Sequence, residues 1–381
     1  MAISQITNKS ITDATITAAD MATGAVEGAM TTQLSGRRNI AYNGAMTVWQ
    51  RGTSADTAST NDYMCDRWQI GHGGLDGNVD WDQETSSTPD GFGYALKVST
   101  DASETSLDAG DYLRFRQKFE GQDLQQLQKG TSGAKSLTLS FWVKSSVAST
   151  YTAELFDEDN TRTIGKSYAI SSADTWEFKT LTFEGDTTGA LTNDNGSSLI
   201  LTFWIDAGST YTGGTFSTAW QANSNSERVY DTTGWLESTT PTFYITGVQL
   251  EVGSVATPFE HRSYGEELLA CSRYFQRWGG DDIYVPFATG FTSSSSRGDF
   301  QIHAKTPMRA KPTFAYNSIV VTDVLTYSIG ASAVTSPTNQ SSVNGNYVYF
   351  TLNSSGATAY RPAFLLANNS TSSFISLDAE L

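Results

Sequence analysis

Hydrophobic and polar residues alternate along many short segments of this chain. In SLTLSFWVK, the side chains of Leu137, Leu139, Phe141 and Val143 fall on one face, and SLILTFWID repeats the pattern at 198–206. A period of two is typical of a half-buried β-strand, and turn-rich stretches separate these segments. The pattern predicts strands at 45–51, 66–71, 94–99, 111–119, 136–145, 150–156, 177–184, 198–206 and 242–250.

Two segments have helical spacing instead. GQDLQQLQ at 121–128 would place Leu124 and Leu127 on one side of a short helix. SYGEELLACSRYFQRW at 263–278 has glutamates in its first turn and arginines in its last, an order that suits the helix dipole. Further strands are expected after it, at 283–289, 299–305, 312–316, 319–330, 347–353, 361–367 and 373–378.

The first 36 residues follow neither period. They contain no aromatic residue, and apolar residues recur every five positions. Such a segment cannot bury its apolar residues alone, but it can do so if identical chains wind together, so we expect an extended segment that is ordered in an assembly. The alternative is a disordered tail. The residues expected to meet their copies on the common axis are Ile6, Ile11, Ile16, Met21 and Val26.

These patterns together predict an all-β protein with four successive parts. An extended N-terminal segment (1–36) precedes a β-sandwich or jelly roll (37–262). A short helical linker (263–278) then leads to a second small β-sandwich (279–381).

Composition and charge narrow the class of protein. The 381 residues carry 24 Lys and Arg against 40 Asp and Glu, a net charge of −16, which disfavours a nucleic-acid partner. The aromatic content, nine Trp, 17 Tyr and 19 Phe, argues against disorder throughout. The chain contains neither a secretory signal nor an apolar run long enough to insert into a membrane. Cys65 and Cys271 match no metal or redox spacing and are expected to be buried thiols.

Several motifs resemble those of one group of proteins. NIAYNGAMTVWQRGT (39–53) and DRWQI (66–70) resemble the opening of a domain found in bacteriophage tail-fibre and other virion proteins. ITGVQLEVGSVATPFEHRSYGEELLACSRYFQRW (245–278) resembles the close of that domain and the linker after it. TPMRAKPT (306–313) looks like a segment of the tip domain that follows, and the five-residue repeat is similar to fibre attachment segments.

The resemblance implies a jelly roll like those of carbohydrate-binding modules, carried on a homotrimeric fibre of the virion. It also implies that residues 1–36 are the attachment and trimerisation segment, with the repeated apolar residues on the trimer axis. The implied partners are copies of the same chain, other virion proteins of the tail or capsid reached through the N-terminus, and a host surface glycan or receptor. The family has no fixed catalytic motif, so we expect a structural, receptor-binding protein that is not an enzyme. The alternatives are a decoration protein without receptor binding and a polysaccharide depolymerase.

Sugar recognition needs aromatic faces for stacking, with polar groups beside them. The irregular stretch STYTGGTFSTAWQANSNSERVYDTTGWLE (209–237) holds aromatic residues outside any clear alternation, which suggests a binding loop. The alternative is that these rings cover one end of the sandwich or a neighbouring subunit. The candidate glycan-binding residues are Trp81, Tyr211, Trp220, Tyr230 and Trp235.

Other chemistry is weakly indicated. The glycine-rich stretch 71–77 lacks the spacing of a dinucleotide fingerprint, so we expect a hairpin loop there and no cofactor. The chain shows no G-x-S-x-G or H-E-x-x-H motif, and no catalytic or metal residue is assigned. Four residues with side-chain oxygens at every second position are candidate ligands of a hard cation, although the stretch lacks the Gly and Glu of a calcium loop. Those residues are Asp76, Asn78, Asp80 and Asp82.

Overall fold

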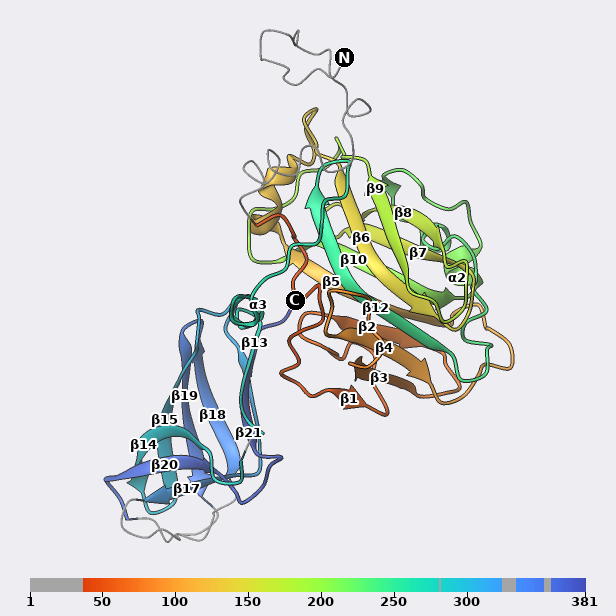
Figure 1. Cartoon of the computed structure of the whole chain (residues 1–381). Coiled ribbons are helices and arrows are strands. Elements are labelled where there is room, and N and C mark those ends of the chain that lie inside the picture. The colour runs from red at the N-terminus through yellow and green to blue at the C-terminus, as the bar shows by residue number, and fades with distance from the viewer. Residues whose placement is uncertain (1–36, 281, 324–333, 353–357) are drawn as a thin grey trace, which may run out of the picture. The chain divides into compact units, whose positions relative to one another are not determined.

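The computed structural model describes residues 37–280, 282–323, 334–352 and 358–381 (Figure 1). Strands in these ranges form four antiparallel sheets, which confirms the all-β class. Asn39–Leu381 make up one compact unit that holds all four. The division at 262 and 278 stays a prediction. The expected trimer-axis residues lie outside the described residues; they are Ile6, Ile11, Ile16, Met21 and Val26.

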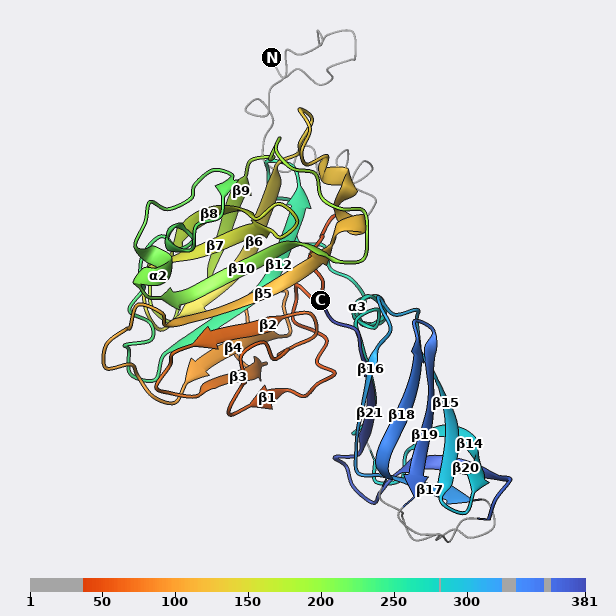
Figure 2. The ribbon, with the colours of Figure 1, turned by 180° about the vertical axis from the view of Figure 1, so that it is seen from behind.

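Two six-stranded sheets form the larger sandwich, and Figures 1 and 2 show them from opposite sides as successive layers. Sheet A has the order β1 (Ser54–Ala55), β3 (Val79–Glu84), β4 (Ala95–Thr100), β12 (Thr242–Val252), β6 (Leu137–Ser145) and β9 (Glu177–Phe183). Sheet B has the order β11 (Gln221–Ala222), β8 (Arg162–Ala169), β7 (Thr150–Asp157), β10 (Ser197–Ala207), β5 (Tyr112–Glu120) and β2 (Gln69–Gly73). Strands close in sequence often lie in different sheets, as in a jelly roll.

The core lies between sheets A and B, where the alternating apolar residues meet. Leu139 and Phe141 of β6 are fully buried against Leu201 and Phe203 of β10. The rings of Phe141 and Phe203 lie 5.0 Å apart in an edge-to-face arrangement. Burial of each such side chain stabilises the fold by about 1.5–3 kcal/mol. The period-two segments therefore face inward as predicted, and the residues between them form the outer faces.

The C-terminal strands form two further sheets with a separate core. One has the order β13 (Phe275–Gly279), β21 (Phe374–Asp378) and β16 (Thr313–Asn317). The other has the order β17 (Ile319–Asp323), β20 (Arg361–Ala367), β14 (Pro286–Ser294), β15 (Arg297–His303), β19 (Gly345–Leu352) and β18 (Val334–Ser342). Phe300, Ile302, Leu365, Ile375 and Leu377 belong to their shared core.

The predicted helix at 263–278 is only half correct. Helix α3 (Tyr264–Cys271) begins with a capping box, in which Ser263 and Glu266 each satisfy the other's backbone N–H. The chain then leaves the helix, and β13 pairs with β21 at the far end of the sequence. The apolar residues with helical spacing in the second half are therefore strand residues. Helix η2 (Gly121–Leu127) buries Leu124 and Leu127 as expected, although it is a 3₁₀ helix.

The predicted strand at 45–51 is absent from the described structure. Asn43 and Met46 have positive φ angles of 51° and 53°, which a strand does not allow. The Asn43 side chain instead accepts hydrogen bonds from the backbone N–H groups of Thr47 (2.8 Å) and Val48 (3.0 Å). Met46 and Val48 are still buried, so their apolar spacing reflects packing of an irregular segment. Conversely, β8 (Arg162–Ala169) forms where no strand was predicted.

Candidate functional site

Residues 208–241 join β10 to β12, and the part from Tyr211 to Val229 packs on the outer face of sheet B, against Trp204. The segment contains α2 (Ser209–Thr212), η3 (Asn225–Glu227) and β11, which adds a short edge to β8. Backbone hydrogen bonds attach it to the sheet, from Gly165 N–H to the Ser217 carbonyl (2.6 Å) and from Tyr230 N–H to the Thr152 hydroxyl (3.0 Å). The insertion is thus a cover for one sheet face, where sequence reasoning allowed a cover for one end of the sandwich.

A buried ion pair anchors this insertion. Arg228 donates two hydrogen bonds, of 2.7 and 2.9 Å, to the carboxylate of Glu154, which is fully buried on β7. The Thr163 hydroxyl and the Trp204 indole N–H also donate to Glu154, at 2.7 and 2.9 Å. Burial alone would raise the pKa of Glu154, but Arg228 and these hydrogen bonds lower it below its ordinary value. The two oxygens of this carboxylate accept four hydrogen bonds from the protein. Glu154 therefore anchors the insertion, and its oxygens have no further site for a ligand.

The structure corrects two of the predicted glycan-binding residues. Trp81, on β3, is only 5% exposed and stacks on Trp49 at 5.9 Å in the core. Trp235 is fully buried, and its indole N–H donates to the Thr242 carbonyl at 3.3 Å. Their ring faces are covered by the sandwich itself and offer no stacking surface. Aromatic residues at loop edges are as useful to a core as to a ligand, and the sequence did not distinguish the two uses.

The other three predicted residues keep some exposed surface but do not converge. Tyr211 packs beside Trp204 (5.2 Å), whereas Trp220 donates its indole N–H to the Glu184 carbonyl (2.7 Å). Tyr230 is 51% exposed and meets Phe216 edge-on at 5.7 Å. No ring contact joins any two of these three described residues. Their role in glycan binding stays a prediction.

An aromatic cleft lies on the outer face of sheet A, and sequence reasoning missed it. We call it the sheet A cleft; its volume is about 250 Å³. Trp142 of β6 and Phe178 of β9 face each other across the strand pairing, with ring centroids 5.4 Å apart. Its lining residues are Phe92, Ser140, Trp142, Phe178, Gly247, Thr257, Pro258, Phe259 and His261.

A β-bulge and a returning loop shape this cleft. The pairing of β12 with β6 is interrupted between Thr246 and Gln249, where Gly247 has a φ of +64°. A Cβ at Gly247 would lie 2.7 Å from the Phe92 ring, so the close approach of that ring requires glycine. The loop after β12 folds back because the Gln249 carboxamide accepts from Glu260 N–H (2.8 Å) and donates to the Thr257 carbonyl (3.2 Å).

The lining combines ring faces with a few polar groups. Phe178 is 49% exposed, so one face of the cleft is open to solvent. Phe259 and His261 close the opposite side, with ring centroids 4.9 Å apart and both within 5.3 Å of Phe92. Ser140 and Thr257 belong to the same lining, although the Thr257 hydroxyl donates to Glu251 at 2.6 Å. Apolar walls with a small number of polar groups are typical of small-molecule sites.

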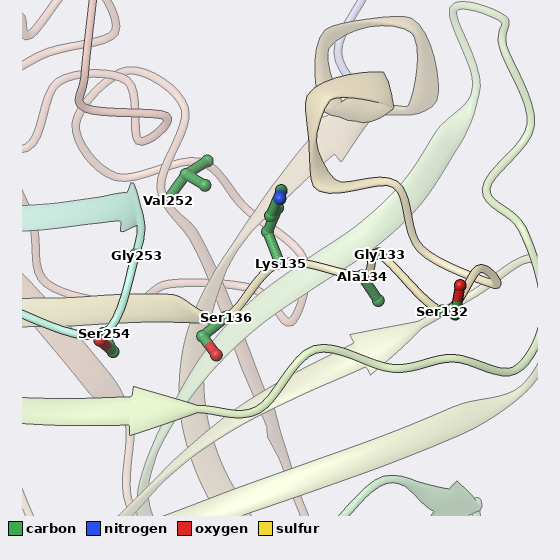
Figure 3. A pocket seen from close by; sticks show the side chains of 8 residues that line it. All are labelled: Ser132, Gly133, Ala134, Lys135, Ser136, Val252, Gly253 and Ser254. Atoms are coloured by element: carbon green, nitrogen blue, oxygen red, sulfur yellow. The ribbon is translucent and has the colours of Figure 1, made fainter.

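A second cleft of about 430 Å³ opens where β6 begins and β12 ends. Figure 3 shows the loop with Ser132 and Lys135 on one side and the turn with Gly253 and Ser254 on the other. Apart from Lys135 and Val252 it is lined by small residues, and its lining includes no aromatic residue. One hydrogen bond, from Gly253 N–H to the Ser136 carbonyl (2.8 Å), joins its two sides. It is larger than the sheet A cleft but lacks stacking surfaces.

The predicted cation residues do not converge on one point. Asn78 bonds to Asp101 through both its backbone and its side chain, and Asp82 pairs with Lys97 at 3.0 Å. Burial and the nearby carboxylates of Asp101 and Asp56 raise the pKa of Asp80. Within the described ranges, no group of three or more His, Cys, Asp or Glu side chains is placed to hold a metal ion. Asp76, Asn78, Asp80 and Asp82 therefore do not form the predicted site in this structure.

None of the helices in the described part of the chain is long and apolar enough to cross a bilayer.

Both cysteines, Cys65 and Cys271, are buried and unpaired, and burial raises the pKa of each thiol. They are structural residues of the core, as predicted.

The features above define an antiparallel β-sandwich protein with an aromatic cleft on one sheet. No protein-family model matches the sequence. A comparison with curated protein sequences likewise gives no match.

Comparison of the fold gives only distant likenesses to solved structures. One is the enzymatically active domain of tailspike protein 4 of bacteriophage CBA120 (13% identity, TM-score 0.30), over 56% of this chain but only 21% of that chain. Another is TmCBM61 in complex with beta-1,4-galactotriose (11% identity, TM-score 0.29), over 57% of this chain and 99% of that one. A third is the family 11 carbohydrate-binding module from Clostridium thermocellum with a mixed-linked tetrasaccharide (13% identity, TM-score 0.27), over 54% and 99%. Likenesses at this level identify neither a ligand nor an assembly for this chain.

Proposed function

We propose that this protein is a non-enzymatic, glycan-recognising component of a phage virion, with the sheet A cleft as a sugar-binding site. The observation that carries the proposal is the meeting of Trp142, Phe178, Phe92, Phe259 and His261 in one solvent-open cleft. The virion part of the proposal rests on the sequence resemblance at 39–70, 245–278 and 306–313.

The chemistry of the cleft suits a sugar ring. One face of a pyranose carries C–H groups that pack on an aromatic ring, and its edges carry hydroxyls that need hydrogen-bond partners. Phe178 and Trp142 supply the ring faces, and Ser140 and His261 supply polar groups. The 250 Å³ volume is below the roughly 300–1,000 Å³ of typical small-molecule pockets, so it suits one or two sugar units.

The lining supports binding without cleavage. Glycoside hydrolysis generally uses two carboxyl groups on either side of the scissile bond, about 5–10 Å apart. The described lining of the sheet A cleft contributes rings, hydroxyls and an imidazole, and includes neither Asp nor Glu. A site of this kind holds a sugar weakly, and several copies on one fibre would add avidity through effective concentration.

The binding site is tested with the full chain and neutral oligosaccharides from host surface polysaccharide, by calorimetry. Phe178→Ala is expected to weaken binding about tenfold, the loss of about 1.4 kcal/mol of stacking. Phe291→Ala is the matched control, because Phe291 is a strand residue with similar exposure (47% against 49%). Equal affinity of the two variants would refute the site. Release of new reducing ends by the wild-type chain would contradict the non-enzymatic proposal.

The assembly is tested separately by mass. A homotrimer predicts a particle of about three times the 41.2 kDa chain mass in light scattering. Ile11→Asp with Ile16→Asp is expected to give monomers, since charges on the proposed axis repel one another. A wild-type monomer would count against the fibre proposal while leaving the glycan test unaffected.

A further inference from the structure

Sheet B carries a row of basic residues on its outer face. Alternation along β5 directs Tyr112, Arg114, Arg116 and Lys118 outward, since the residues between them are buried. Such a row is unusual in a chain with a net charge of −16. It lies on the other sheet from the sheet A cleft, so it forms a different surface.

Arg114 differs from its basic neighbours in having no polar partner. Arg116 donates to the side chains of Gln69 (2.8 Å) and Asn61 (3.1 Å), and Arg228 is paired with Glu154. The Arg114 guanidinium lies over the rings of Trp204 (4.7 Å) and Tyr112 (5.1 Å). Its Nε is buried without a hydrogen-bond partner, and its two terminal nitrogens, on a side chain that is only partly buried, make no hydrogen bond within the described chain.

The electrostatic surroundings of Arg114 favour an incoming anion. Burial, followed by repulsion from Arg228 and Arg116, lowers the pKa of Arg114 to about 10. The group still carries its positive charge at neutral pH, but burial and the two neighbouring arginines make the charged form less stable than it is in water. Glu154 attracts it, yet that carboxylate is committed to Arg228, Thr163 and Trp204. An anion bound at the terminal nitrogens would offset this repulsion.

The glycine-rich stretch of β2 explains how these side chains are arranged. Gly71 pairs with Arg114 and Gly73 with Tyr112 in the β2–β5 register. A Cβ at Gly71 would lie 3.4 Å from Arg114 Nε, and one at Gly73 would lie 2.9 Å from the Tyr112 ring. The contact at Gly71 is an ordinary van der Waals distance, whereas the approach of the Tyr112 ring over β2 requires glycine at position 73. Tyr211 of the insertion then meets Tyr112 edge-on at 5.4 Å.

We propose that Arg114, Tyr112 and Tyr211 form a subsite for an acidic sugar, in which the terminal nitrogens of Arg114 bind the sugar carboxylate and the tyrosine rings contact the sugar. The planar fork of a guanidinium matches a carboxylate in two parallel hydrogen bonds, and the paired form of each group is the charged one. The ligand class rests on the proposed glycan recognition, but the subsite shares no residue with the sheet A cleft. It also gives the predicted candidate Tyr211 a specific role.

The test compares an oligosaccharide containing glucuronic acid with its carboxyl-reduced, neutral counterpart, titrated into the full chain. The acidic form is expected to bind at least about tenfold more tightly, in line with charged hydrogen bonds, and less so as salt rises. Arg114→Gln should abolish that difference. Arg361→Gln, which removes an arginine from β20, is the matched control and should preserve it.

Further arms separate the possible failures. Arg114→Lys keeps the charge but loses the fork, so it should retain only part of the preference and gives a second reading if Arg114→Gln misfolds. A sugar phosphate that binds in place of the carboxylate would reassign the ligand and overturn the carboxylate proposal. Equal binding of the acidic and neutral forms would also overturn it. Phe178→Ala should leave the acid preference intact, so failure of the sheet A cleft and failure of this subsite are distinguishable.

Discussion

Arg67 and Glu380, which are 313 residues apart in the sequence, form an ion pair in which the Arg67 side chain is fully buried and that of Glu380 is 5% exposed. Arg51 reaches the other oxygen of Glu380 at 3.2 Å. The Tyr63 hydroxyl and the Lys118 ammonium donate to the Leu381 carbonyl at 3.0 and 2.9 Å. Glu380 and Leu381 are therefore bonded to the first segments of the larger sandwich, between Arg51 and Arg67, and to β5 through Lys118.

The first prediction concerns this ion pair. Glu380→Ala leaves the Arg67 guanidinium buried without its counter-charge, and we expect the free energy of unfolding to fall by about 3–5 kcal/mol. Glu184→Ala is the control, because the Glu184 side chain is 66% exposed and its pair with Lys166 contributes less than about 1 kcal/mol. Urea unfolding of the two variants measures the difference. Equal losses of unfolding free energy in the two variants would mean that the buried pair stabilises the fold no more than the exposed pair does.

The second prediction concerns pH. Burial raises the pKa of Asp66 from 3.8 to about 6, although Arg51 and hydrogen bonds from Gln50 act to lower it. Between these two values the folded protein keeps a proton that the unfolded chain has released. Stability from this group is therefore present at low pH and is lost as pH rises through about 6, by up to about 3 kcal/mol.

Asp66→Asn isolates this effect, since the variant has no proton to release at that position. The difference in unfolding free energy, wild type minus variant, should decrease between about pH 4 and about pH 7. Other carboxyl groups titrate in both proteins and cancel in the difference. A difference that stays constant or increases with pH would show that Asp66 is ionised in the folded protein at low pH.

The third prediction concerns the anchor of the insertion. Arg228→Ala leaves Glu154 charged and buried without a cation, so we expect a loss of about 3–5 kcal/mol and faster proteolysis within 208–236. Adding Glu154→Gln removes the stranded charge, so the double variant should be more stable than Arg228→Ala alone. Lys97→Ala, which breaks a partly exposed pair with Asp82 on sheet A, is the control for both measurements. A double variant that is less stable than the single one would argue against this explanation.

The fourth prediction concerns the shape of the sheet A cleft. Gly247→Ala places a Cβ 2.7 Å from Phe92 and 3.2 Å from Trp142, so the aromatic wall must move and sugar binding should weaken severalfold. Gly234→Ala is the matched control, because its φ (+69°) is close to that of Gly247 (+64°) and no atom lies within 4 Å of its Cβ. Both variants lose about 1 kcal/mol of stability to backbone strain. Only Gly247→Ala should change the calorimetric affinity.

Local patterns predicted most of the strands because alternation reports burial directly. Leu139 and Phe141 face the core in the structure as the alternation predicts, which also places Trp142 on the outer face. Local patterns do not predict which strands pair with each other. Phe275 has helical spacing from Cys271, yet it pairs with Asp378 in a sheet. Its conformation depends on a strand about 100 residues away, which no local window contains.

The candidate sites show the same division. Trp235 and Tyr230 occur in the same irregular stretch, but one ring is fully buried and the other is half exposed. Trp142 and Phe178 come from different strands, and the register of β6 with β9 places them opposite each other. Arg114 is one of three basic residues on β5, and only the neighbours supplied by β2, β10 and the insertion leave it without a polar partner.

By itself, the sequence determined the all-β class, the inward faces of the strands with clear alternation, the acidic net charge and the burial of the two thiols. Each of these depends on local period or on composition. The tertiary structure decided which aromatic rings are core and which line a surface, where the helix after residue 263 ends, and which charges find partners. Those outcomes depend on contacts between residues far apart in the chain, whose energies exceed local preference.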